Sequence, residues 1–187
     1  QSDQIAFVVQ LDRDARNKIT LADLAEQFRH WIQHNLELTI TIGLGAESDS
    51  IETIAESYRN AAENVSLKIV FGTNTWIDNR LRARKNNVDH YAWLQALESA
   101  AQSFRMNEND WRQKLTHIFT ELKESLFTRQ DVNAFVNSFV QQMEKAVQAL
   151  SAEIQTLWQD EYRLQFEHLH ENIETLDELY ERLMNLM

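Results

Sequence analysis

The amino-terminal part of the chain contains three segments whose apolar residues are spaced as in β-strands. Residues 5–11 (IAFVVQL) are mostly apolar and β-branched, which predicts a central strand. Residues 38–43 alternate between apolar and polar side chains, as a half-buried strand does. A third, short strand is expected at 74–77. These segments together predict a small sheet.

Two helices are predicted between these strands. Over residues 20–35, apolar side chains recur at spacings of three and four, and Thr20 is a suitable N-cap. The second helix is expected to begin after Asp49 or Ser50 and to continue to the residue before Gly72. Glycine adopts the left-handed conformation that ends many helices, so Gly72 is the predicted stop.

The rest of the chain has helical spacing only. Helices are expected over residues 90–104, 107–126, 128–157, 160–170 and 175–186. Thr175, followed three residues later by Glu178, is the pattern of a capping box and predicts the start of the last helix.

The helix expected over residues 128–157 carries the longest apolar stripe of the chain. Its apolar residues repeat at spacings of three and four over about 30 residues, or about 45 Å of helix. Such a stripe is typical of a helix that packs in a bundle core or along a second copy of itself. The candidates for this core or dimer seam are Val132, Phe135, Val136, Phe139, Met143, Val147 and Leu150.

These elements predict an α+β fold in two parts. Residues 1–80 are expected to form a partial ferredoxin-like sheet with two helices, and residues 81–187 an all-α helical bundle. The chain has three glycines and no proline, which favours helices because turn-rich all-β folds depend on these residues. With 43% hydrophobic residues, the chain can bury a core.

The chain is acidic, with a formal net charge of −11. DNA carries about one negative charge per 1.7 Å and therefore repels such a surface. The compact basic cluster of Arg80, Arg82, Arg84 and Lys85 is interpreted as a solvated linker or helix start, with a phosphate or partner contact as the alternative. The absence of cysteine excludes disulfides and fits a cytoplasmic protein. No apolar run is long enough to span a membrane.

Gly43 and Gly45 follow a predicted strand and precede a predicted helix, which is the order of elements at a phosphate-binding loop. A dinucleotide fingerprint needs a third glycine where Ser48 stands, and the lysine of a Walker loop is absent. Acidic residues crowd the helix start, where they favour the helix dipole and repel a phosphate: Glu47, Asp49 and Glu52. We interpret the two glycines as the exit of a strand.

Two histidine pairs are the candidates for a metal site. His30 and His34 are four residues apart on a predicted helix, a spacing that can chelate a metal, but the pattern supplies no third ligand. His168 and His170 are two residues apart and do not share a helical face. We interpret both pairs as surface histidines. Because no catalytic triad or pair of carboxylates in an apolar setting is identified, the expectation is no enzyme activity, no metal and no cofactor.

Residues 36–77 resemble the C-terminal half of a GGDEF domain, the fold of diguanylate cyclases. The family pattern is a strand ending in Ser-x-Gly, a helix with an Ala-x-x-Ala-Leu-Tyr-like segment, a Gly-x-Asn turn and a last strand. The matching segments here are Thr41-Ile42-Gly43, Tyr58-Arg59-Asn60-Ala61-Ala62, Gly72-Thr73-Asn74 and Trp76-Ile77. The match is closer to the degenerate GGDEF-like module of AraC-type bacterial transcription regulators, which include YesN-like two-component response regulators.

The resemblance implies a regulatory function rather than catalysis. The GG(D/E)EF hairpin of the cyclases has no counterpart in this chain, nor has the paired helix-turn-helix domain of the regulators. The chain is therefore expected to be a fragment that forms a homodimer and transmits a signal. In its parent protein it would follow a receiver or sensor domain, and it would contact DNA only through the missing domain. The alternatives are a nucleotide-binding, cyclase-related fragment and a structural helical interaction protein.

Overall fold

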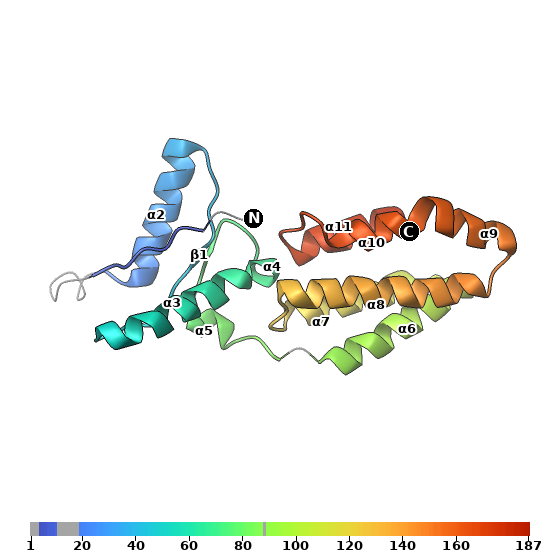
Figure 1. Cartoon of the computed structure of the whole chain (residues 1–187), viewed down its shortest axis with the longest axis horizontal. Coiled ribbons are helices and arrows are strands. Elements are labelled where there is room, and N and C mark those ends of the chain that lie inside the picture. The colour runs from blue at the N-terminus through green and yellow to red at the C-terminus, as the bar shows by residue number, and fades with distance from the viewer. Residues whose placement is uncertain (1–3, 11–18, 88) are drawn as a thin grey trace. The chain divides into compact units, whose positions relative to one another are not determined.

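A computed structural model of the chain describes residues 4–10, 19–87 and 89–187. The chain forms two compact units (Figure 1). We call residues 1–68 and 73–84 the N-terminal unit, and residues 69–72 and 85–187 the helical unit. Each unit is described by itself.

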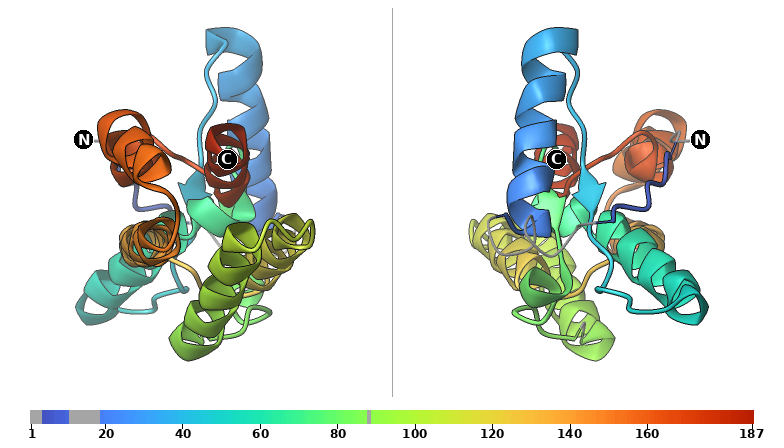
Figure 2. Two further views of the ribbon diagram at one scale, coloured as in Figure 1. Left: turned by 90° about the vertical axis from the view of Figure 1, so that its right-hand side faces the viewer. Right: turned by 90° about the vertical axis from the view of Figure 1, so that its left-hand side faces the viewer.

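The N-terminal unit contains helix α2 (Leu21–Leu36), which begins where a capping residue was predicted. The hydroxyl of Thr20 accepts a hydrogen bond from the backbone N–H of Asp23 at 3.1 Å, and the backbone N–H of Thr20 donates to the Asp23 carboxylate at 2.9 Å. This capping box provides acceptors for two backbone N–H groups at the start of the helix. Only Ala25 of α2 is buried, and Figures 1 and 2 show the C-terminal half of the helix projecting away from the rest of the unit.

Strand β1 (Ile42–Gly43) pairs in parallel with strand β2 (Trp76–Ile77), and helix α3 (Ile51–Ser66) lies between them in the sequence. Gly43 allows α3 to approach β1 closely, because a Cβ atom at this position would lie 2.1 Å from the backbone oxygen of Ala61. A buried Asn64 side chain on α3 donates to the backbone oxygen of Leu44 at 2.7 Å. The close backbone approach at Gly43 and the side-chain hydrogen bond of Asn64 thus hold α3 against β1 and the residue that follows it.

The predicted partial ferredoxin-like sheet is wrong. The structure is 68% helical, and the sheet of the described residues has two strands of two residues each. Residues 4–10 form no strand, and residue 11 lies outside the described residues. The apolar spacing of 5–11 and 38–43 is strand-like, but a strand also needs hydrogen-bonded neighbours, which the described part of the chain supplies only at β1 and β2.

The prediction of a single helix up to Gly72 is wrong at its C-terminal end, because α3 ends at Ser66 and a short helix, α4 (Lys68–Phe71), follows Leu67. The predicted stop is confirmed, since Gly72 has a φ of +89°. Ile69 of α4 is buried in the core of the helical unit. After β2, helix α5 (Asn79–Arg82) begins at Asp78, whose carboxylate accepts from the backbone N–H of Leu81 at 2.8 Å.

The helical unit is built around three helices that follow one another in the chain. These are α6 (His90–Arg105), α7 (Trp111–Lys123) and α8 (Arg129–Gln148), and α6 packs against both of the others. Phe135 of α8 lies at the centre of their core and is fully buried. Its ring centroid is 5.4 Å from that of Trp93 on α6 and 5.4 Å from that of Phe119 on α7. Aromatic contacts therefore join all three helices.

The prediction of a single helix over residues 128–157 is wrong at its C-terminal end. Helix α8 ends at Gln148, and α9 (Ala152–Leu157) begins after Ser151. The chain reverses direction at this turn, as Figure 1 shows. A π-helical turn (Trp158–Tyr162) and α10 (Arg163–Glu167) then return along α8, where the rings of Phe139 and Phe166 are 5.6 Å apart. The apolar spacing continues in the sequence past the turn, but Ile154 and Leu157 of α9 are each 43% exposed and are not part of the buried core.

The last helix, α11 (Leu176–Leu186), follows a short 3-10 turn (His168–His170). As predicted, the hydroxyl of Thr175 accepts from the backbone N–H of Glu178, at 3.2 Å. The capping box is only half formed, since the Glu178 carboxylate accepts from the backbone N–H of Glu174 instead of Thr175.

Two arginines bind the loop before α11. The Arg129 guanidinium, at the start of α8, donates to the backbone oxygens of His170, at 2.6 Å, and Ile173. The Arg182 guanidinium donates to those of Glu171 and Asn172, at 2.8 and 3.4 Å. Four consecutive carbonyl groups thus accept hydrogen bonds from cations, which fixes the loop between α8 and α11.

Candidate functional site

Of the glycine pair predicted to be a strand exit, Gly43 is the last residue of β1, and Gly45 lies in the loop between β1 and α3. The backbone of α3 leaves no space at either position, since a Cβ atom at Gly45 would lie 2.3 Å from the backbone oxygen of Ser57. Both glycines therefore serve close packing of the helix on the strand. This packing alone accounts for the Gly-x-Gly pattern.

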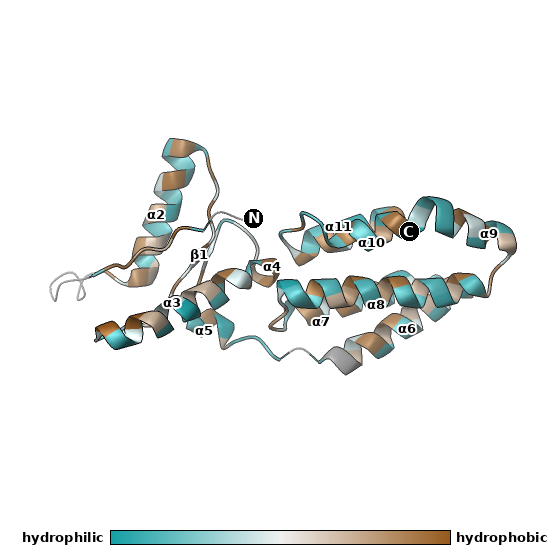
Figure 3. Cartoon of the chain, viewed as in Figure 1, coloured by the Kyte–Doolittle hydropathy of each residue, from teal (hydrophilic) through white to brown (hydrophobic). Residues whose placement is uncertain are grey.

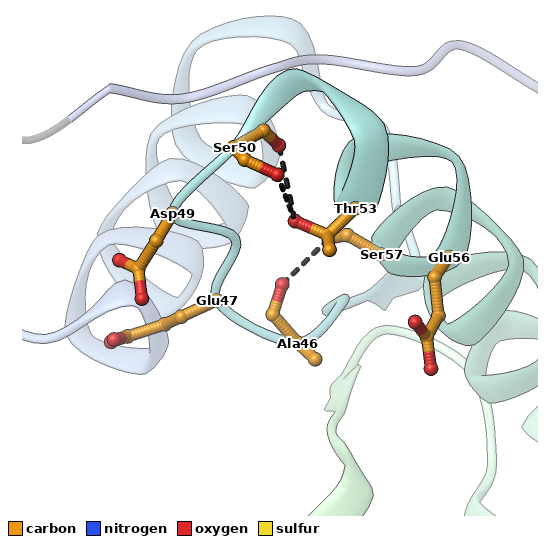
Figure 4. Close-up of a pocket in the computed structure, with 7 residues that line it drawn as sticks. All are labelled: Ala46, Glu47, Asp49, Ser50, Thr53, Glu56 and Ser57. Atoms are coloured by element: carbon orange, nitrogen blue, oxygen red, sulfur yellow. Dashed lines mark hydrogen bonds between the residues drawn. The ribbon is translucent and has the colours of Figure 1, made fainter.

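A shallow depression of about 310 Å³ lies at the start of α3, beside this loop (Figure 4). Two hydroxyl groups that line it donate to backbone oxygens of the loop: Ser57 to that of Ala46 at 2.7 Å, and Thr53 to that of Ser50 at 3.0 Å. Three carboxylate residues line the depression: Glu47, Asp49 and Glu56. The negative charge of these groups opposes the binding of a phosphate at this helix N-terminus.

The histidine pairs are not brought together with further metal ligands. His30 is exposed, and its Nε2 atom lies 2.9 Å from a Glu26 carboxylate oxygen that also accepts from Arg29. This arrangement lowers the pKa of Glu26, chiefly through its hydrogen bond with Arg29. His168 Nδ1 lies 2.7 Å from the backbone oxygen of Leu164. Within the described ranges, no group of three His, Asp or Glu side chains has the arrangement of a metal site.

The basic cluster at residues 80–85 is divided between the two units. In the N-terminal unit, Arg82 forms an ion pair with Glu63. In the helical unit, Lys85 donates to the backbone oxygen of Lys123 at 2.6 Å and lies over the ring of Phe71. Arg82 and Lys85 therefore each have a partner within their own unit.

The residues predicted for a core or dimer seam lie inside the helical unit of a single chain. Helix α8 buries six of them almost completely, whereas Leu150 is half-buried in the turn after the helix. The buried six are Val132, Phe135, Val136, Phe139, Met143 and Val147. They pack in the hydrophobic core that also contains residues of α6, α7, α10 and α11. In this packing they are not accessible to a second chain.

Six exposed apolar side chains of residues 4–10 and of α2 belong to the N-terminal unit, and sequence reasoning missed them. Phe7 contacts Phe28 of α2 edge to face, with ring centroids 6.1 Å apart. Figure 3 shows residues 4–10 as mostly hydrophobic and α2 with both hydrophobic and hydrophilic positions. We call the following exposed set the N-terminal apolar surface: Ile5, Phe7, Val8, Val9, Phe28 and Trp31. The pattern of 5–11 had predicted a buried central strand, which is why these side chains were not recognised as a surface.

No protein-family model, curated protein or solved structure matches the chain. Among the described helices, none combines the length and the apolar character needed to cross a membrane.

Proposed function

We propose that the chain is a dimerising, signal-transmitting module of a cytoplasmic bacterial transcription regulator and that it catalyses no reaction itself. The observation that carries this proposal is the N-terminal apolar surface. Phe7 is 70% exposed and Trp31 54% exposed, on a chain whose net charge of −11 keeps other surfaces apart. A group of exposed apolar side chains of this size is typical of a protein–protein contact.

The assignment to a transcription regulator rests on the resemblance of residues 36–77 to the degenerate GGDEF-like module. The support for this resemblance comes from residues 42–77 alone. The strand–helix–strand order of that segment is present as β1, α3 and β2, and Asn74 of the Gly-x-Asn turn has a φ of +54°. In this proposal a helix-turn-helix domain of the parent protein contacts DNA, and a receiver or sensor domain supplies the input.

Helix α8 is the proposed transmitting element of the helical unit. Its apolar face packs on α6 and on α10, so a displacement of either helix changes the packing around Phe135 and Phe139. Closely packed cores respond to such a displacement by moving whole helices rather than by compressing. The helical unit would thereby carry an input along its length.

A reporter fusion tests the proposal. Residues 1–187 are joined to a monomeric DNA-binding head that represses a reporter only as a dimer, with Phe7→Asp as the variant and Ile51→Asp as the control. Ile51 is 83% exposed on α3, outside the N-terminal apolar surface. We expect repression with the wild-type fusion and with the control, and its loss with Phe7→Asp. No repression by the wild-type fusion would contradict the dimerising function.

Calorimetric titration separates this proposal from the nucleotide-binding alternative. With GTP or a cyclic dinucleotide as the titrant, we expect no heat of binding, because carboxylates line the depression at the start of α3. Saturable heat that Glu47→Lys abolishes or alters would instead support a cyclase-related fragment.

A further inference from the structure

Residues 4–10 present exposed apolar side chains and a backbone that has no partner segment among the described residues. Ile5 is 79% exposed, Val8 81% and Val9 50%. Among the described residues, no backbone hydrogen bond joins this segment to another part of the chain. A segment that combines β-branched side chains with unpaired N–H and C=O groups is a template for a further strand.

The order of residues in this segment is self-complementary when the direction is reversed. The sequence QIAFVVQ reads from Gln4 to Gln10, with Phe7 at its centre. In an antiparallel pair centred on Phe7, each residue lies opposite one of similar character: Gln4 opposite Gln10, Ile5 opposite Val9, Ala6 opposite Val8, and Phe7 opposite Phe7. Cross-strand pairs of β-branched and of aromatic residues stabilise a sheet. We propose that residues 4–10 of two copies of this chain pair as antiparallel strands about a two-fold axis at Phe7.

The charge distribution favours a second copy of the chain as the partner of residues 4–10. The segment contains no charged residue, although the chain as a whole has a net charge of −11. Two copies can therefore meet here without bringing like charges opposite each other, a contact that would destabilise a strand pair. A basic peptide or a nucleic acid finds no oppositely charged group in this segment to bind.

The area also suits a dimer. Residues 5, 7 and 9 share one face of an extended strand, and the ring contact of Phe7 with Phe28 extends that face onto α2. Trp31 lies one helical turn further along α2. The six side chains of the N-terminal apolar surface together expose on the order of 800 Å², which is what each partner buries in a standard interface. Helix α2 thus supports a strand pair that would be marginal alone.

This inference deepens the dimerising part of the proposed function and rests on it. The following tests use the chain without a reporter or DNA. A failure of the transcriptional role and a failure of the strand pairing are therefore distinguishable.

Cysteine cross-linking tests the register, because the natural chain has no cysteine. Ile5→Cys and Val9→Cys are prepared as two single variants, oxidised separately and as a mixture. Opposite residues of an antiparallel pair have Cα atoms about 4.5–5.5 Å apart, within the range of a disulfide. Two like thiols would instead lie about 13 Å apart along the strands.

We expect a disulfide-linked dimer from the mixture and little from either variant alone. Cross-linking of each variant with itself would indicate a parallel pair and would overturn the proposal. No cross-linking in any sample would also overturn it.

Sedimentation velocity measures the association itself. Phe7→Asp places two carboxylates opposite each other at the axis, and Ile51→Asp is the matched control. We expect the wild-type chain and the control to dimerise with equal affinity, and Phe7→Asp to weaken the dimer about 100-fold or more. A wild-type chain that remains monomeric at about 1 mM would overturn the proposal, as would equal effects of the two substitutions.

Discussion

Replacing Phe135 with alanine tests whether α8 is the centre of the helical unit. Phe135 is fully buried, and its ring contacts the rings of Trp93, Phe119 and Phe127 at centroid distances of 5.4, 5.4 and 6.4 Å. Truncating a buried phenylalanine costs about 3–5 kcal/mol. Each aromatic pair adds about 0.5–1.5 kcal/mol beyond the buried area, so we expect a loss in the upper half of that range.

Urea unfolding followed by tryptophan fluorescence measures this loss. In a background with Trp31→Phe and Trp76→Phe, all remaining tryptophans belong to the helical unit. With a slope of about 2 kcal/mol per M, a loss of about 4 kcal/mol lowers the unfolding midpoint by about 2 M.

Leu164→Ala is the control for this measurement. Leu164 on α10 is 61% exposed, and its truncation should change the free energy of unfolding by less than about 0.5 kcal/mol. If Phe135→Ala cost less than about 1 kcal/mol, the assignment of α8 to the core would be refuted.

Three further substitutions test local features of the structure. Gly43→Ala should destabilise the N-terminal unit by about 1–3 kcal/mol, because the added methyl group meets the backbone of α3. Urea unfolding measures this loss, and an unchanged unfolding midpoint would refute the close packing of α3 on β1. The hydrogen bonds of Asp23 with Thr20 lower the pKa of its carboxyl, so this stabilisation is present above the unfolded pKa of 3.8 and is lost as the pH falls through the folded value. Asp23→Asn should therefore reduce the fall in melting temperature between pH 7 and pH 3. An unchanged fall would contradict the stabilising role of the hydrogen bonds between Asp23 and Thr20. Arg129→Lys should destabilise the helical unit by about 1–2 kcal/mol, since lysine cannot donate to two carbonyl groups in the same planar geometry, and equal thermal stability of the two proteins would argue against this role.

Local patterns predicted the helices well, since helix starts and stops depend on a few neighbouring residues. Thr20 and Thr128 each pair with an aspartate three residues later, and α2 and α8 begin after them. Gly72 ends α4 in the left-handed conformation. The break after Gln148 could not be predicted in this way, because no glycine or proline marks it and the apolar spacing continues. The return of α10 along α8, a contact distant in sequence, determines it.

The strands and the candidate surface were less predictable, because both depend on what a segment contacts. Residues 5–9 have the composition of a buried strand, yet their side chains are exposed. Alternation and β-branching describe what a segment can do next to a partner, and they do not supply that partner. The reversed self-complementarity around Phe7 is the signal in the sequence that points to a second chain.

The ionic strength dependence of dimerisation follows from the same distribution of charge. Several cations are already used within one chain: Arg82 pairs with Glu63, and Arg163 lies 2.9 Å from Glu167. The net charge of −11 therefore acts between copies as repulsion, whereas the segment that pairs carries no charge. Salt shortens the Debye length from about 30 Å at 0.01 M to about 10 Å at 0.1 M and so screens that repulsion. In sedimentation experiments, the affinity of the dimer should therefore rise with the salt concentration. An interface built on ion pairs would instead weaken. A loss of affinity with salt would thus exclude an uncharged strand pair as the basis of the dimer.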